Sequence, residues 1–221
     1  MPIQRKVNKD FFKEWSPDMA YVLGFFAADG SMYETKRGTK YLDFTSVDKE
    51  LIEQVKTALD SEHKIGRRAT PDNHQDVYHL QIGSKDMFSD LRSLGITPRK
   101  TRILSFPDVP KEFTGDFVRG YFDGDGTVWV GTIHASREVN SVGITTRFTS
   151  SSVGFLEDLS ELLAENAGMG KGSLSEADKA HSLQYSISDS LLLYEVMYGN
   201  LVSDLFLSRK REKFEIFLKS R

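Results

Sequence analysis

The chain has 221 residues, 39% of them hydrophobic, and a formal net charge of −3 at pH 7. This length and composition suit one large core or two modest ones. The absence of cysteine excludes disulfides, thiolate metal sites and cysteine nucleophiles, and is compatible with an intracellular protein. No apolar run approaches the roughly 20 residues of a membrane span, and residues 1–15 lack the apolar core of a signal peptide. We therefore expect a soluble, intracellular protein that binds no membrane.

Residues 21–30 form an apolar segment that stops at Asp29-Gly30. In a helix, Gly24 and Ala28 lie on one face because they are four residues apart. Without bulky side chains on that face, two such helices could pack with their backbones unusually close. The glycine after the acid is suited to ending a helix in the left-handed conformation, which we expect here.

The elements expected next come in a regular order. An extended stretch ends at 44–46, and an amphipathic helix follows with apolar residues between 51 and 59. A second strand pair closes on 80–84, another helix follows, and the first half reaches Arg99-Lys100. A linker is predicted over 106–112, since its prolines break any helix or central strand.

The second half repeats this order. Residues 117–126 form another apolar segment, with Gly120 and Gly124 four apart, and it stops at Asp125-Gly126. A strand ending at 148–150, a helix over 155–163, a strand pair closing on 185–188 and Arg209-Lys210 follow. The repetition divides the chain into repeats 1–105 and 113–221, and near-equal intervals equate Ile82 with Ile187.

The duplication gives the chain two acids in equivalent positions, Asp29 and Asp125. If the two helices pack closely, their like charges raise one another's pKa unless a cation is shared. Carboxylate oxygens with no cysteine favour a hard divalent ion, Mg²⁺ in particular. A calcium loop is rejected because Val128 stands where an EF-hand needs glycine. Residues 168–173 are not a phosphate loop, because Gly follows Lys171, and we expect a glycine-rich hairpin turn there.

These two segments resemble the motif of the LAGLIDADG homing endonucleases, in the single-chain form with two motif copies. The matching stretches are 23–30 and 119–126, with Arg119 departing from the usual apolar residue. The resemblance implies an α+β fold of two pseudo-symmetric αββαββα repeats, a saddle of antiparallel sheets, with the motif helices at the repeat interface. It implies a monomer that cuts both strands of double-stranded DNA at a long asymmetric target and leaves short 3′ overhangs. Mg²⁺ would be the cofactor, with Mn²⁺ as a possible substitute, and no protein partner is implied.

The resemblance also assigns site residues. Asp29 and Asp125 would hold the metal and act in catalysis. Lys100 and Lys210 would lie near the scissile phosphates, although two solvated lysines at helix starts would look the same. Ser46 and Ser150 would position water, or would simply cap the helices that follow them.

The sheets would read base edges in the major groove. Cations concentrate in the predicted strands and many acids in the helices, which suits a basic face in a chain of negative net charge. Every second strand residue would face the duplex, and the sequence leaves open which parity does so. The candidates are Arg37, Lys40, Arg67, Arg68, His74, Gln75, His79, Gln81, Arg137, Arg147, Lys171, His181 and Gln184.

Two other classes remain open. One is a non-cleaving or bifunctional protein of the same fold, either a maturase that assists intron RNA splicing or a regulator that binds DNA. The other is an unrelated α+β protein whose duplicated Asp-Gly helices are only structural. The chain does not look like an intein with its own splicing domain, since it has no Cys, Ser or Thr at residue 1 and no terminal His-Asn.

Overall fold

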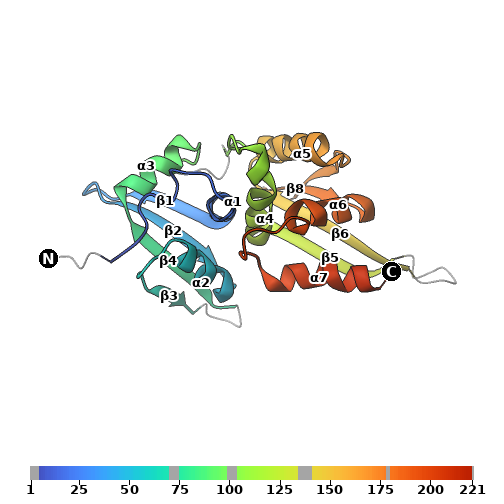
Figure 1. Ribbon diagram of the computed structural model, residues 1–221, viewed down its shortest axis with the longest axis horizontal. Coiled ribbons are helices and arrows are strands. Elements are labelled where there is room, and N and C mark those ends of the chain that lie inside the picture. Colours follow the sequence, from blue (N-terminus) through green and yellow to red (C-terminus); the bar gives the residue numbers. More distant parts are fainter. Residues whose placement is uncertain (1–4, 70–74, 99–103, 134–140, 178–179, 221) are drawn as a thin grey trace. The chain divides into compact units, whose positions relative to one another are not determined.

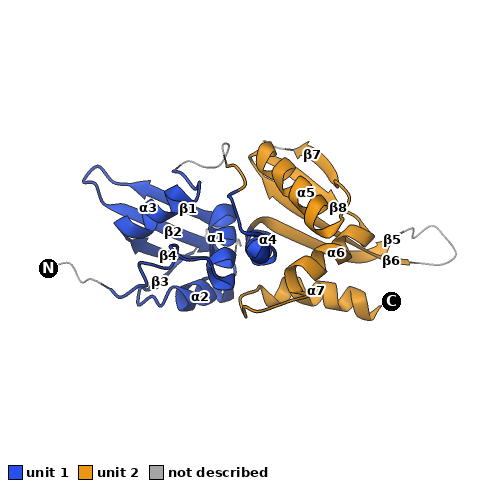
Figure 2. Ribbon diagram, turned by 45° about the horizontal axis from the view of Figure 1, so that its top comes forward, with its two compact units in different colours: residues 1–100, 107–124 blue, residues 101–106, 125–221 orange. Residues whose placement is uncertain are grey.

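A computed structural model describes most of the chain. The described ranges are 5–69, 75–98, 104–133, 141–177 and 180–220. Their contacts divide the chain into two compact units, coloured separately in Figure 2. Unit 1 comprises 1–100 and 107–124, and unit 2 comprises 101–106 and 125–221. The predicted repeats follow the sequence repetition and stay a prediction; packing instead assigns nearly all of the second motif segment to unit 1.

Unit 1 is a sheet with helices on one face (Figure 1). Its elements are α1 (Pro17–Asp29), β1 (Gly30–Glu34), β2 (Lys40–Ser46), α2 (Lys49–Ala58), β3 (Ile65–Arg68), β4 (Val77–Gly83), α3 (Lys85–Ser93), the 3₁₀ turn η2 (Lys111–Phe113) and α4 (Thr114–Asp125), whose last residue belongs to unit 2. The four strands are antiparallel in the order β1-β2-β4-β3. Ser16 caps α1, since its side chain accepts a hydrogen bond from the amide of Met19 at 3.1 Å.

Unit 2 contains a second four-stranded sheet of the same topology. Its elements are β5 (Gly126–Ile133), β6 (Ser141–Ser150), α5 (Val153–Ala167), β7 (Ser173–Ala177), β8 (Ala180–Tyr185), α6 (Ile187–Tyr198) and α7 (Ser208–Lys219). The strand order β5-β6-β8-β7 matches that of unit 1 position by position, and all pairs are again antiparallel. The predicted α+β fold with two antiparallel sheets is confirmed.

Strand register fixes which side chains enter each core. In unit 1, Leu42 pairs with Ile82 and Phe44 with Leu80, and all four are fully buried under the helices. In unit 2, Phe148 pairs with Leu183 and Thr146 with Tyr185. The counterpart of Ile82 is therefore Tyr185. Equating Ile82 with Ile187 was wrong, because Ile187 begins α6 and the second half reaches its last strand position two residues earlier.

The glycine-rich stretch after α5 is not a hairpin turn. It connects α5 to β7, and Gly168 ends the helix with φ 64° and ψ 23°, the left-handed conformation in which glycine is not strained. The prediction of a hairpin there was wrong because the sequence did not show that the helix continues to Ala167.

Candidate nucleic-acid interface and motif acids

Helices α1 and α4 approach each other at their glycines. A Cβ on Gly24 would lie 2.1 Å from the carbonyl oxygen of Phe117, and one on Gly120 would lie 2.0 Å from the carbonyl oxygen of Tyr21. Real Cβ atoms do not tolerate such distances, so each glycine admits the backbone of the other helix. The predicted close packing through small residues is confirmed within unit 1.

Each motif acid ends its helix, and each is half-buried. Asp29 lies beside Gly124, where an added Cβ would meet the Asp29 Oδ2 atom at 3.4 Å and the Ala28 Cβ at 2.5 Å. The second motif therefore needs glycine at this place to leave room for the first motif's Ala-Asp end.

The predicted left-handed helix ends were wrong. Gly30 has φ −79° and ψ 150°, which is extended backbone, and it is already the first residue of β1. Gly126 likewise begins β5. Glycine is needed at 30 for space, because a Cβ there would lie 2.3 Å from the Phe26 ring. Each acid thus stands at a direct helix-to-strand junction.

The departure at Arg119 is accommodated by a buried polar cluster. The Arg119 guanidinium is almost fully buried, pairs with Asp116 at 2.6 Å and lies 5.4 Å from the centre of the Tyr21 ring. The Tyr21 hydroxyl donates to Asp123 at 2.8 Å. Burial raises the pKa of the Asp116 carboxyl, and the charge and hydrogen bond of Arg119 oppose that rise. The packing of this turn is therefore preserved, with an ion pair in the place of an apolar contact.

Ser46 and Ser150 occupy matching buried positions at the ends of β2 and β6. The Ser46 hydroxyl accepts from the amide of Asp48, and the Ser150 hydroxyl from the amide of Ser152, each at 3.1 Å. The residues at the N-cap positions are Asp48 and Ser152. The interpretation of Ser46 and Ser150 as N-caps was therefore wrong by two residues, while the role in positioning water stays a prediction.

The structure describes only one of the two predicted lysines. Lys210 lies in the first turn of α7 and is only 3% exposed, so it is not a solvated surface lysine. Its helix packs on β5 and β6, and the Lys213 side chain donates to the Val128 carbonyl at 3.2 Å. Lys100 lies outside the described residues.

The sequence left open which alternate residues of each strand share the face opposite the helices, and the structure of unit 1 shows which do. The face of the sheet opposite the helices, here called open face 1, carries a set of mostly polar side chains. They are Ser31, Tyr33, Tyr41, Asp43, Thr45, Arg68, Val77, His79 and Gln81. Gln81 donates to the Tyr33 hydroxyl at 2.8 Å, and the rings of Tyr33 and Tyr41 stack with centres 5.4 Å apart.

Asp43 is the unusual member of open face 1. It is 9% exposed, and its Oδ1 atom is buried without a hydrogen-bond partner among the described residues. Burial raises the pKa of the Asp43 carboxyl, an effect that the nearby His79 and Arg68 partly offset. An unsatisfied buried acceptor is costly, so a donor from a water or a ligand would be stabilising at this atom. Sequence reasoning missed Asp43, because only the strand register shows which face it occupies.

The corresponding open face 2 belongs to unit 2. Its described members include Thr127, Trp129, Thr145, Arg147, Thr149, Ser173, Ser175, Ser182 and Gln184. Arg147 is exposed and donates to the Gln184 side chain at 2.8 Å, and Trp129 is 46% exposed. Sequence reasoning missed Trp129, although an aromatic residue two places after Thr127 on the exposed parity was a usable signal.

The structure sorts the predicted DNA contacts. Arg68, His79, Gln81, Arg147 and Gln184 lie on the open faces. Lys40, Arg67 and His181 lie on the other face of their sheets, and their contact with DNA stays a prediction. Arg37, Gln75 and Lys171 lie in connections between elements and are exposed. His74 and Arg137 fall outside the described residues.

The contacts of the opposite-parity cations explain their direction. Lys40 lies 5.0 Å from the centre of the Phe88 ring of α3, on the helix side of the sheet. Arg67 pairs with Asp76 at 2.6 Å.

The described residues contain no cluster of three or more His, Asp or Glu suited to a metal. No helix among them is long and apolar enough to span a membrane.

Comparison with known proteins identifies the architecture. A family model described as a LAGLIDADG-like domain matches residues 16–100 and 112–171. A structure of the LAGLIDADG meganuclease I-AabMI bound to uncleaved DNA is 15% identical, with 93% of this chain and 90% of that chain covered at a TM-score of 0.62. The homing endonuclease I-WcaI bound to its DNA recognition sequence has the same identity and coverage, at a TM-score of 0.64. At these identities the likeness concerns the fold.

Two proteins of Methanocaldococcus jannaschii match part of the chain. The uncharacterized protein MJ0398 is 28% identical over 119 residues, which are 51% of this chain and 40% of that protein. The DNA-directed RNA polymerase subunit Rpo1C is 29% identical over 153 residues, 66% of this chain and 16% of that subunit. The chain thus spans less than half the length of each of these two relatives.

Proposed function

The chain belongs to the family of the LAGLIDADG-like domain, and we propose that it is a site-specific endonuclease that cleaves both strands of duplex DNA. One observation carries the proposal. Each of two similar four-stranded sheets has a polar open face, and the first strand of each follows directly on a helix that ends in an acid. This arrangement joins a surface able to read base edges to a carboxylate in both halves of the chain. Solved proteins of similar fold are bound to DNA targets.

The donor set of the motif acids fits a hard divalent cation. Asp29 and Asp125 offer carboxylate oxygens, and both side chains are half-buried, so they are accessible to an ion. Mg²⁺, with Mn²⁺ as a possible substitute, is the proposed cofactor. When bound, it would supply positive charge to stabilise the charge that develops on the phosphodiester during hydrolysis.

The chain's own residues would orient the reactants. The buried hydroxyls of Ser46 and Ser150 are fixed by their amide partners, so they are suited to holding a water at a constant place. We assign to Lys210, in α7, and to Lys100 the role of stabilising negative charge near the scissile phosphates. The two sets of Asp, Ser and Lys would serve one strand each.

The open faces would select the target. Strand side chains of one parity can reach base edges in the major groove, where arginine pairs with guanine and carboxylates accept from cytosine. Different side chains at equivalent places of the two faces favour an asymmetric target. One chain with both motif copies would act as a monomer, leave short 3′ overhangs, and serve the homing of a mobile genetic element.

The test is cleavage of a library of randomised duplexes with Mg²⁺, followed by sequencing of the cut ends. Wild type is compared with Asp29→Asn and Asp125→Asn, variants that keep side-chain size and remove one charge. Asp18→Asn is the matched control, since Asp18 stands in the first turn of α1, at the opposite end of the helix from Asp29.

We expect wild type and Asp18→Asn to cut one long asymmetric sequence and each motif variant to lose double-strand cutting. A protein that selects a sequence but cuts it with no divalent ion would refute nuclease activity and leave a DNA-binding regulator. Selection of no duplex, with binding of a structured intron RNA, would favour a maturase.

A further inference from the structure

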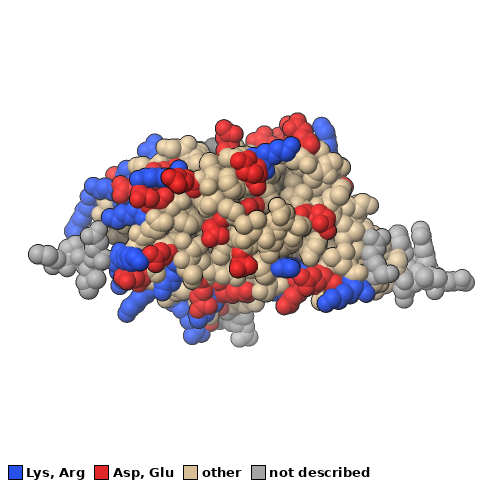
Figure 3. All heavy atoms as spheres, in the orientation of Figure 1, with Lys and Arg blue, Asp and Glu red and all other residues tan. Residues whose placement is uncertain are grey.

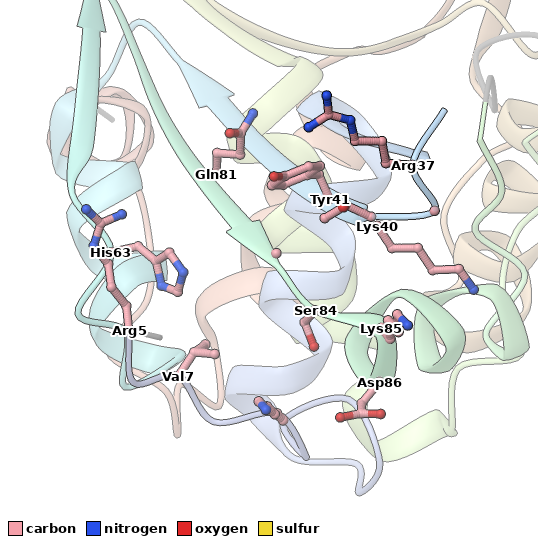
Figure 4. Close-up of a pocket in the computed structure, with 14 residues that line it drawn as sticks. Arg5, Val7, Arg37, Lys40, Tyr41, His63, Gln81, Ser84, Lys85 and Asp86 are labelled. Carbon is pink, nitrogen blue, oxygen red and sulfur yellow. The ribbon is translucent and has the colours of Figure 1, made fainter. Parts of the chain in front are cut away.

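A cavity of about 730 Å³ lies at one end of open face 1 (Figure 4). It is formed by the N-terminal segment, the turn between β1 and β2, the end of β4 and the start of α3. Five of its lining residues are cationic and one is acidic. They are Arg5, Lys9, Arg37, Lys40, Lys85 and Asp86. We call this the basic cavity. Burial, together with the nearby charges of Arg5 and Lys56, lowers the pKa of its histidine, His63.

The cations of the basic cavity differ from several neighbouring cations in their ion pairing. Within the described part of the chain, none of the five makes an ion pair. Outside the cavity, Lys6 pairs with Asp60 at 2.6 Å, Lys13 with Asp10 at 2.5 Å and Lys49 with Glu53 at 2.6 Å. On the face drawn in Figure 3, Lys and Arg lie over unit 1 with Asp and Glu among them. The basic cavity itself has five Lys or Arg side chains and one acid, which suits an anion of several charges.

The N-terminal segment is held so that alternate residues line the cavity. Arg5, Val7 and Lys9 line it. The intervening residues bind the end of α2: the Asn8 amide donates to the Leu59 carbonyl at 2.9 Å, and the Glu62 amide donates to the Lys6 carbonyl at 2.9 Å. Because these bonds fix the backbone, a ligand bound by Arg5 and Lys9 does not have to order the segment that carries them.

The cavity is continuous with open face 1. Tyr41 and Gln81 belong to both, and Gly83 pairs with Tyr41 at the same end of the sheet. This end is remote from the motif acid, since β1 runs away from Asp29 for five residues, or about 17 Å. A duplex bound on open face 1 would therefore reach the basic cavity only with its outer part. Its inner base pairs would lie nearer to the motif acid.

We propose that the basic cavity binds the sugar-phosphate backbone of the target duplex on the outer flank of one half-site. The inference rests on the proposed function. Phosphates are the anions that such a flank presents, and contacts to them add affinity and fix register without reading sequence. The cavity would thus anchor unit 1 on DNA beyond the base pairs that the sheet reads.

The segment that precedes the second motif helix differs from the N-terminal segment in its described residues. The segment that precedes α4 runs from Leu104 to Phe113 and contains one cation, Lys111, where the N-terminal segment has several. Its beginning packs on α5 instead: Ser152 donates to the Leu104 carbonyl at 2.7 Å, and the Phe106 and Phe155 rings stack. The proposal therefore concerns the flank that unit 1 would bind.

The test compares two triple variants of equal charge change. Arg5→Ala/Lys9→Ala/Lys85→Ala removes cavity cations, and Lys6→Ala/Lys13→Ala/Lys49→Ala removes neighbouring cations that are already paired. Affinity for the selected duplex is measured against salt with Ca²⁺ in place of Mg²⁺, and again with the duplex shortened at either end. Each lost phosphate contact lowers the slope of log affinity against log salt by about 0.9, so three lower it by about 2.7.

We expect the cavity variant to lose about two units of slope or more, the control variant to keep the wild-type slope, and both variants to keep the wild-type base preference. Shortening one end should reduce the wild-type slope by the same amount and leave the cavity variant unchanged. Equal slopes for the two triple variants, or equal effects of shortening on both, would overturn the proposal. A wild type that binds no duplex would instead refute the proposed function.

Discussion

Replacing Gly24 by alanine should force helices α1 and α4 apart. The added Cβ would lie 2.1 Å from the Phe117 carbonyl oxygen, whereas ordinary contact begins at 3.4 Å. The difference, 3.4 − 2.1 = 1.3 Å, has to come from movement of one backbone against another, because both atoms are held in helices. A gap of 0.5–1 Å already forfeits about a quarter to a half of each dispersion contact along the seam.

The expected loss of stability follows from two opposing terms. Overpacking costs about 3 kcal/mol when backbone has to move, at the upper end of the usual range. Alanine regains about 1 kcal/mol of helix propensity over glycine. The net loss of about 2 kcal/mol lowers the thermal midpoint by about 4–8 °C for a chain of this size. Gly120→Ala should act alike, since its Cβ would meet the Tyr21 carbonyl oxygen at 2.0 Å.

The assay is thermal unfolding followed by circular dichroism, with Gly154→Ala as the matched control. Gly154 lies in the first turn of α5, and its Cβ would meet nothing within 4 Å. The control should therefore be stabilised by up to about 1 kcal/mol through propensity alone. If Gly24→Ala and Gly154→Ala shift the midpoint in the same direction, the inferred close packing of α1 on α4 is incorrect.

Three further predictions concern the open faces and the junction serines. Because burial raises the pKa of Asp43, its stabilising protonated form is complete below the unfolded pKa and lost as pH rises through the folded pKa. Asp43→Asn should therefore raise the free energy of unfolding at neutral pH by an amount on the order of 1 kcal/mol, and with it the unfolding midpoint; both gains should vanish in acid. A gain that persists in acid would contradict this. Arg147→Ala should weaken selection of guanine at one position by about 1–3 kcal/mol in a library experiment, with other positions unchanged. Ser46→Ala and Ser150→Ala should each cost about 1 kcal/mol in denaturant unfolding, since each removes a hydrogen bond to a buried hydroxyl; no loss in either would refute that role.

Local sequence predicted the helix packing better than the helix ends. The spacing of Gly24 and Ala28, repeated at Gly120 and Gly124, indicated close packing because helical periodicity alone places them on one face. The backbone of Gly30 could not be predicted in this way. An Asp-Gly pair is compatible with a left-handed end, and only the approach of the Phe26 ring and the immediate start of β1 show that glycine provides space there.

The site was predictable where it follows chain order and not where it depends on strand register. The motif acids and serines recur at fixed places along the two halves. Lys40 and Asp43, by contrast, are three positions apart in one strand, and a shift of one residue exchanges their faces. The pairing of Leu42 with Ile82 fixes that choice: Lys40 turns toward α3, and Asp43 turns to open face 1.

If the two sheets bind DNA as proposed, the same register would let them bind dissimilar half-sites. Ser31 pairs with Asp43 in unit 1, and Thr127 pairs with Arg147 at the equivalent place in unit 2. The backbone at the two places is the same, but one side chain accepts hydrogen bonds and the other donates them. Because an acceptor suits the amino group of cytosine and an arginine suits guanine, equivalent strand positions favour different bases. A symmetric target would leave one of the two charges opposite an unsuitable base edge, so the asymmetry of the sequence is itself a reason to expect an asymmetric site.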